Sequence, residues 1–590
     1  MAVKIRQRKI NRSAERFSAS SGFTCARIFR GGSVIAFLLG APVASQQLND
    51  GQGLGALSPT LSFRTDYFGY AASISPRIGY SDNIDLVSDV MPDPAAPNTR
   101  IDNPNKADDF IASTAFSGNA IYASRAFTGL VVGDVEVGYL VDGEDVNFNQ
   151  RVAGVGTATL RENLFYFDVS GSTSRQLAGD NARFSNNLNA GFGQRTDVHT
   201  YSVSPYLNKR FGDNSAAEIR YRFSQVFVDD DNSDISGGIL NGSKSQELAL
   251  VYDTGDKFQN LTMRYTAYGS RTNEKESLAL PAFEFERGTI LAEAEYVLTD
   301  SLALTGSIGY DEIRSDAPAD LISGPDLSGL NWLAGFRYRP GRRTDLLVQY
   351  GERFGDDYIN ANFRYQLSKR LSFDANAERQ FRTRAQAVNS QFAISQRRIL
   401  DFADRLRGGE KVSPNGLVGD ATRIFDRFQT AQTIGVSASD VYNVRISGIY
   451  DRTQVGISAD YADDDFGFRQ VETIGGSGYI QRQFSRRLTG YADAFYRFAD
   501  TTFDIDDCIA APQFFGFNAN EPGFNAMESC VAFAAENGET KTAGASIGLR
   551  YQFYRNLALF GEYSYTTRFS DEPLLEFEEN FVQTGLILDL

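Results

Sequence analysis

Hydrophobic and polar residues alternate with period 2 along most of the chain from about residue 70 onward. The clearest stretch is 330–381, where segments of about ten residues are separated by turns. In the first of these segments Trp332, Phe336 and Tyr338 share one face, while Arg337 and Arg339 share the other. The pattern predicts strands with one apolar, aromatic face and one charged face.

The connections between these segments alternate in length. Short turns recur, among them Pro340-Gly341, Lys369-Arg370 and Arg486-Arg487. Longer stretches rich in acidic residues, Gly, Asn and Pro lie near 82–107, 177–194, 230–242, 271–281, 313–328 and 504–539. Such alternation is typical of periplasmic turns and extracellular loops. It predicts an all-β fold, a transmembrane antiparallel up-and-down β-barrel of about 22 strands within a range of about 18–26.

A soluble sandwich or propeller is the alternative, since its strands also alternate. A sandwich would need strands buried on an inner face to form a core, and no uniformly apolar strands stand between the amphipathic ones. A helical membrane protein would need apolar runs of roughly 20 residues, which are absent. The 45 Phe and 28 Tyr against one Trp suit aromatic girdles at a membrane interface. A barrel closed in lipid fits best, because it pairs every backbone donor and leaves no edge.

The first 45 residues have the features of an export signal. A basic lead is followed by a short apolar stretch, Val34 to Leu39, and then by Ala41-Pro42-Val43-Ala44-Ser45. Small residues at Val43 and Ser45 satisfy the cleavage rule, so the mature chain is expected to begin at Gln46. We therefore predict a signal peptide at 1–45, a periplasmic linker at 46–69 and the barrel at 70–590, in the cell outer membrane of a Gram-negative-type bacterium.

One region departs from the β pattern. Apolar residues fall at helical spacing in 391–407 and again in 417–428, with Gly408-Gly409 and Pro414-Asn415-Gly416 between them. This predicts a helical hairpin inserted at about 386–436, after roughly the fifteenth strand. Two interpretations stay open for it: an ordinary folded surface loop, or a lid or constriction at the mouth of a pore.

Two segments carry a resemblance to a known family. They are Tyr338-Arg339-Pro340-Gly341-Arg342-Arg343-Thr344 and Tyr365-Gln366-Leu367-Ser368-Lys369-Arg370-Leu371-Ser372. The chain resembles a family of outer-membrane β-barrel porins often encoded with exopolysaccharide export genes, from about residue 70 to its end. The resemblance implies an outer-membrane pore, with polysaccharide or small solutes as cargo, and supplies no catalytic residues. The rival hypothesis is a closed structural or binding barrel that presents its extracellular loops without transport.

Composition narrows the chemistry further. Loss of residues 1–45 changes the formal charge from −16 to −23, which disfavours nucleic acid as a partner. His199 is the only histidine, and it shares its face with Tyr201 and Val203, the expected lipid side. We therefore expect no enzyme activity, no cofactor and no metal site. The expected partners are outer-membrane lipid and the barrel assembly machinery.

The candidate functional residues are those expected to face the lumen. By strand parity they are Arg220, Arg222, Arg264, Asp311, Arg337, Arg339, Arg364, Asp374, Glu378 and Arg550. They could form cross-strand ion pairs that hold a wide barrel in register, or they could favour anionic solutes. Cys25 leaves with the signal, so Cys508 and Cys530 are predicted to pair in the oxidising periplasm and close a long loop.

Overall fold

The computed structural model describes residues 67–590, apart from 94–95, 178–181, 213, 229–241, 276–281, 317–326, 384–435, 466–468, 511, 513–516, 518–523, 537 and 571–574. The expected signal peptide (1–45), most of the linker (46–69) and nearly all of the helical insertion (386–436) lie outside the described residues. The first strand begins at Tyr67, slightly before the expected barrel boundary at 70.

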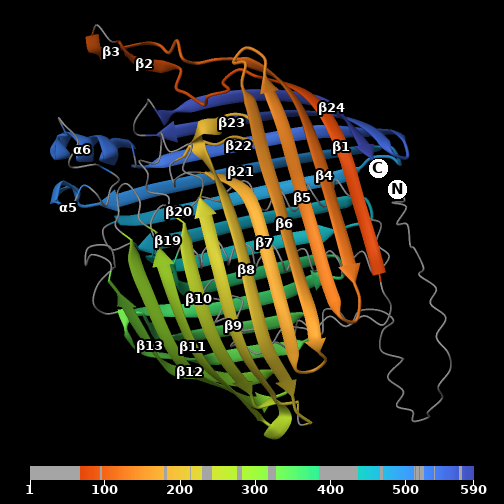
Figure 1. Ribbon diagram of the computed structural model, residues 1–590, viewed down its shortest axis with the longest axis vertical. Helices are drawn as coiled ribbons and strands as arrows, with labels where there is room; N and C mark the ends of the chain where they lie inside the picture. Colours follow the sequence, from red (N-terminus) through yellow and green to blue (C-terminus); the bar gives the residue numbers. More distant parts are fainter. Residues whose placement is uncertain are drawn as a thin grey trace.

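Twenty-two strands form one closed antiparallel sheet (Figure 1). They are β1 (Tyr67–Ser81), β4 (Asp109–Ala123), β5 (Phe127–Leu140), β6 (Val146–Arg161), β7 (Phe165–Leu177), β8 (Arg195–Arg210), β9 (Ala216–Val228), β10 (Ser243–Asp253), β11 (Leu261–Glu274), β12 (Phe283–Thr299), β13 (Leu302–Ser315), β14 (Gly329–Gly341), β15 (Thr344–Arg353), β16 (Asp356–Ser368), β17 (Leu371–Thr383), β18 (Val436–Ile449), β19 (Thr453–Asp465), β20 (Arg469–Gln483), β21 (Leu488–Phe503), β22 (Thr540–Tyr554), β23 (Leu557–Ser570) and β24 (Phe577–Asp589).

Each barrel strand pairs with its neighbour along the chain, and β24 closes the ring on β1. In that seam Ile74 lies opposite Leu588, and Ser81 lies opposite Phe581. A separate hairpin, β2 (Val90–Asp93) with β3 (Ala96–Asp102), stands in the connection from β1 to β4. The predicted up-and-down barrel is confirmed, with a strand count inside the expected range.

The two ends of the barrel differ in their connections. The β2–β3 hairpin and the helices α5 (Ile505–Ala510) and α6 (Ala526–Glu536) lie at one end, and the short turns lie at the other (Figure 1). The first strand begins and the last strand ends on the short-turn side. Short turns on the side of the chain ends are typical of the periplasmic face, so the long connections are extracellular. The insertion at 384–435 follows β17, the fifteenth strand of the barrel.

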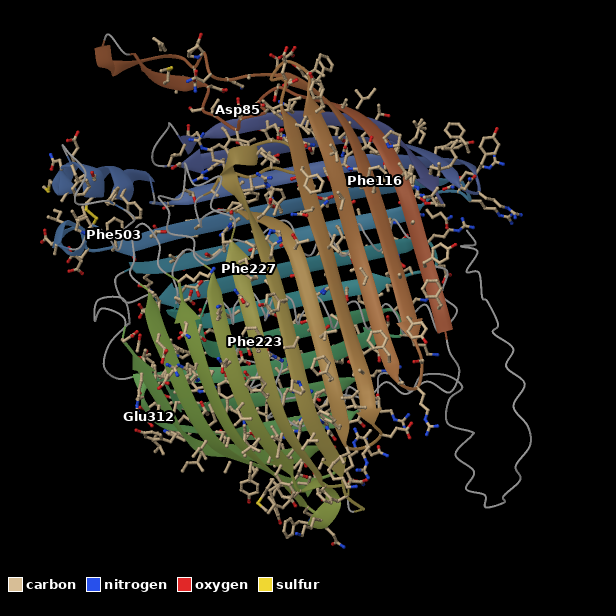
Figure 2. All side chains as sticks on the ribbon, viewed as in Figure 1. Asp85, Phe116, Phe223, Phe227, Glu312 and Phe503 are labelled. Atoms are coloured by element: carbon tan, nitrogen blue, oxygen red, sulfur yellow. A yellow bond between two sulfur atoms is a disulfide. The ribbon has the colours of Figure 1, made fainter. Side chains whose placement is uncertain are left out.

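Side chains alternate across the barrel wall as the pattern predicts. On β14, Trp332, Phe336 and Tyr338 are exposed, whereas Leu333 and Arg337 are buried. Phe116 on β4 and Phe227 on β9, labelled in Figure 2, likewise belong to the exposed outer face. Large apolar groups exposed all round a closed sheet are stable only in lipid, where a barrel satisfies its own backbone. The protein is therefore an outer-membrane β-barrel.

Neither described helix, α5 or α6, is long and apolar enough to cross a membrane.

Candidate functional site: the lumen and its inward-folded loop

The connection between β7 and β8 enters the barrel. Within residues 182–194, the side chains of Phe184, Asn187, Asn189 and Ala190 are all buried. They contact inward-facing residues of β5, β6, β21 and β24, so the segment lies inside the extracellular half of the barrel, along one arc of the wall. This segment lies within the stretch near 177–194 that was expected to be a long extracellular connection, and the structure adds that it folds inward. We call residues 182–194 the lumen loop.

Amide side chains anchor the lumen loop to two carboxylates of the wall. Asn187 Nδ2 donates to Glu579 Oε1 at 3.0 Å, and Asn189 Nδ2 donates to Glu136 Oε1 at 3.2 Å. Ser81 Oγ donates to the same Glu579 oxygen at 2.6 Å. Glu579 is only 1% exposed. Removing a partner from a buried polar group costs about 1–3 kcal/mol, so these bonds hold the loop in place.

Apolar contacts hold both ends of the same segment. The rings of Phe184 and of Phe495 on β21 stack with centroids 5.6 Å apart, beside the buried Leu177. At the far end Ala190 packs with Ile84 and Leu86, which follow β1. The lumen loop is therefore fixed to the wall at two places by packing as well as by hydrogen bonds.

Two glycines make room for this path. A Cβ on Gly138 of β5 would lie 2.5 Å from Asn189 Oδ1, so any side chain there would have to displace the amide of Asn189. Gly191 has φ of 58°, and a Cβ on it would lie 2.7 Å from Leu86 Cδ1. Its backbone N–H donates to the Ile84 carbonyl at 2.8 Å. Any other residue at 191 would be strained in this left-handed conformation.

The expected lumen residues of β9–β15 lie on the inner face and form buried ion pairs. Arg220 pairs with Asp168 and Glu218 at 2.8 Å each. Asp311 contacts Arg353 at 3.2 Å and Arg287 at 3.4 Å. Further pairs are Arg222–Glu247 at 3.7 Å, Arg264–Asp253 at 3.1 Å, Arg337–Asp345 at 2.5 Å and Arg337–Glu295 at 3.6 Å. Arg339 lies 3.2 Å from Asp345, but its side chain is 37% exposed. These contacts favour the interpretation that the charges hold the barrel together.

The other expected lumen residues are more accessible. Arg364 on β16 pairs with Asp374 on β17 at 2.9 Å, with side chains 48% and 40% exposed. Arg550 on β22 lies 3.9 Å from Asp589, and Glu378 is half-buried on β17 opposite Val441 of β18. The ten residues therefore share the inner face but do not converge on one point.

The wall also carries an aromatic platform that the sequence analysis missed. Tyr479 on β20 lies opposite Asp493 on β21, and Gln481 on β20 lies opposite Tyr491 on β21. Tyr479 and Tyr491 are therefore diagonal neighbours on the same face of the sheet. Each tyrosine ring lies over a glycine of a neighbouring strand, Gly456 on β19 or Gly548 on β22. A Cβ on Gly456 would be 2.3 Å from Tyr479 Cε1, and one on Gly548 would be 2.2 Å from Tyr491 Cζ.

The two rings are half-buried, so they lie along the wall and keep part of their surface accessible from the lumen. The Tyr491 hydroxyl reaches across Gly548 to donate to Glu562 on β23. We call Tyr479, Gln481, Tyr491 and Asp493 the tyrosine platform. Only the strand register reveals it, since the glycines are distant from the tyrosines in sequence.

The extracellular connection from β21 to β22 contains the two mature cysteines. Cys508 on α5 and Cys530 on α6 form a disulfide with Cα atoms 5.9 Å apart, and both are buried. The segment expected as a loop at 504–539 thus holds two helices, whose apolar side includes Phe533 packed against Phe503. His199 lies on the outer face of β8, opposite Thr173. No group of three or more potential metal ligands occurs among the described residues.

Among known proteins, the chain is similar to solved structures of β-barrels. No family model matches the sequence, and no curated protein matches it either. The chain is similar to the ferric-catecholate import receptor Fiu of E. coli K12, with 10% identity, a TM-score of 0.44, and 90% of this chain and 82% of that one covered.

It is also similar to the ferric enterobactin receptor PfeA of Pseudomonas aeruginosa, with 9% identity, a TM-score of 0.43, and 88% and 80% covered. The FrpB iron transporter of Neisseria meningitidis has 8% identity, a TM-score of 0.44, and 93% and 83% covered. At such identities and TM-scores these likenesses support no assignment of function.

Proposed function

We propose that the protein is an outer-membrane channel for hydrophilic solutes whose lumen is narrowed by the lumen loop. The observation that carries this proposal is the anchoring of residues 182–194 inside the barrel by Glu136, Glu579 and Phe495. A barrel of this strand number is wide, and comparable outer-membrane barrels carry material inside their lumen. A loop fixed by buried hydrogen bonds narrows such a pore and sets which solutes pass.

The solutes we favour are saccharides, which agrees with the resemblance to porins encoded with exopolysaccharide export genes. Sugar rings have apolar faces that stack on aromatic rings, and hydroxyl groups that bind amides and carboxylates. The tyrosine platform offers both kinds of group on one patch of the inner wall. Its half-buried rings are available to a solute in the lumen.

Planar-bilayer recordings of the mature protein test the channel. Wild type is expected to give stepwise conductance, and a variant lacking the lumen loop, residues 182–194, is expected to give larger steps because the obstruction is gone. Asn105→Ala, at an exposed site outside the barrel, is the control and should conduct like wild type. Electrical silence of both wild type and the loop deletion would refute the channel.

Current block by oligosaccharides tests the solute class. Tyr479→Ala and Tyr491→Ala should weaken block, while Tyr496→Ala, on the exposed outer face of β21, should leave it unchanged. Equal block in all four proteins would remove saccharides from the proposal while leaving the channel in place.

The second candidate is a closed structural or binding barrel. It is favoured by the buried ion pairs of β9–β15, which leave Arg220 and Asp311 almost no exposed surface. A closed barrel predicts silence with and without the lumen loop, so the same recordings separate the two candidates.

A further inference from the structure

Basic residues gather on the short turns of one arc of the barrel. The turns after β14, β16 and β20 carry Arg342-Arg343, Lys369-Arg370 and Arg486-Arg487, and all six residues are exposed. These turns stand at the periplasmic end, opposite the acidic extracellular connections. We call the six residues the basic arc.

Acidic neighbours leave most of this charge uncompensated. Arg370 pairs with Asp451 at 2.7 Å, whereas the other five residues have no acidic partner within the part of the chain that the structure describes. On another turn of the same rim the charges do cancel, because Arg125 donates to Glu162 through two nitrogens. That bond lowers the pKa of the Glu162 carboxyl from its ordinary value. The basic arc therefore carries a net excess of positive charge.

The aromatic residues near the basic arc indicate how deep it lies in the membrane. Tyr338, Tyr365 and Phe484 are exposed on the outer surface, a few residues before the three basic pairs. Aromatic belts of this kind mark the boundary between hydrocarbon and headgroups. Each strand residue advances the chain by about 3.3 Å, so the cations lie just beyond that boundary, at the depth of lipid phosphates.

We propose that the basic arc binds the phosphate groups of anionic phospholipids in the periplasmic leaflet. Guanidinium groups bind phosphate through two parallel hydrogen bonds, and clustered cations next to a membrane attract acidic headgroups. A soluble acidic protein is a weaker fit, because the arc adjoins side chains that face lipid.

Spin-labelled lipids in reconstituted vesicles measure the preference directly. Vesicles with phosphatidylglycerol in both leaflets present it to the arc whichever way the barrel inserts. Wild-type full-length protein should prefer labelled phosphatidylglycerol over labelled phosphatidylcholine by at least about threefold, and 1 M salt should abolish the preference through screening. Changing all six residues to Gln should bring the ratio to about one.

A pair of double variants provides a matched comparison. Arg342→Gln with Arg343→Gln should lower the preference measurably. Arg271→Gln with Arg314→Gln, at exposed arginines of the extracellular end, should not. The proposal is overturned if wild type shows no preference, if the six-residue variant keeps it, or if polyglutamate binds the arc and displaces the labelled lipid from it.

Discussion

The inner wall of the barrel is built in two ways. Strands β9–β15 fill it with ionised side chains such as Arg220, Arg287 and Asp311, which are buried and paired. Strands β19–β22 instead lay aromatic rings over glycines such as Gly456 and Gly548. The first design relies on electrostatic pairing in a poorly solvated interior, where a broken pair is costly. The second relies on close packing and leaves ring surface accessible. We therefore propose that the charged wall mainly stabilises the barrel and that the wall with the aromatic rings contacts solutes.

The largest expected effect is the loss of the central carboxylate of the charged wall. Asp311 accepts from Arg353, Thr289 and Asn331 and also contacts Arg287. Asp311→Ala should therefore destabilise the barrel by about 3–5 kcal/mol, as expected when a buried ion pair loses one member. The readout is loss of the heat-modifiable folded band on electrophoresis. Asp374→Ala, in an accessible pair, should cost at most about 1 kcal/mol. A similar loss of stability in both variants would contradict the difference between buried and accessible ion pairs.

The next effect separates the inner from the outer face. Phe363 and Phe373 pack together on the outside, with ring centroids 5.4 Å apart, while Arg364 lies inside. Phe363→Arg should impair assembly, since an arginine facing lipid costs about 2–4 kcal/mol near mid-bilayer. Arg364→Phe should assemble more readily. Normal assembly of Phe363→Arg together with failure of Arg364→Phe would invert the face assignment.

A smaller effect is expected from filling a glycine of the packed wall. Gly548→Val would force Tyr491 off the wall, at a cost of about 1–3 kcal/mol for overpacking. Oligosaccharide block should weaken as the tyrosine platform is disrupted. Gly561→Val on β23 is the control, because a Cβ there meets nothing closer than 4.0 Å. The packing of Tyr491 on Gly548 would be refuted if oligosaccharides blocked the Gly548→Val variant as they block wild type and if the variant unfolded at the same temperature.

The smallest effect on the barrel concerns the disulfide above the packed wall. Non-reduced peptides of the mature protein should show Cys508 linked to Cys530 by mass spectrometry. Replacing both with Ser should expose 504–539 to protease while the folded band keeps its melting temperature, since the bond joins α5 to α6 and not two strands. Free thiols in freshly extracted protein would refute the pairing, and a lower barrel melting temperature would assign the bond a wider role.

Strand positions and faces could be read from local pattern. Tyr338 and Arg337 differ in direction because neighbouring side chains in a strand point to opposite faces, and this period-2 rule needs no tertiary information. The lumen side of Arg220, Asp311 and Arg364 follows from the same rule. Their partners do not, since Asp311 meets Arg353 across strands that only the register brings together.

The lumen loop shows where local pattern is insufficient. The segment is rich in Gly and in polar residues such as Asn187 and Asn189, a composition that is just as typical of a loop exposed to solvent. Nothing near them in sequence indicates Glu579, which lies 392 residues from Asn187 along the chain. The tyrosine platform was missed for the same reason, because its glycines come from neighbouring strands.

By itself, the sequence determined that this chain forms a closed antiparallel barrel in lipid, with short turns at one end and long connections at the other. The alternation of apolar and polar residues and the residue types of the turns are properties of neighbouring residues in the chain, so they can be recognised without knowledge of the fold. The tertiary structure alone decided which charges pair, which connection enters the lumen and which rings line it. Those outcomes depend on ring closure and strand register, which bring residues such as Ser81 and Glu579 within hydrogen-bonding distance.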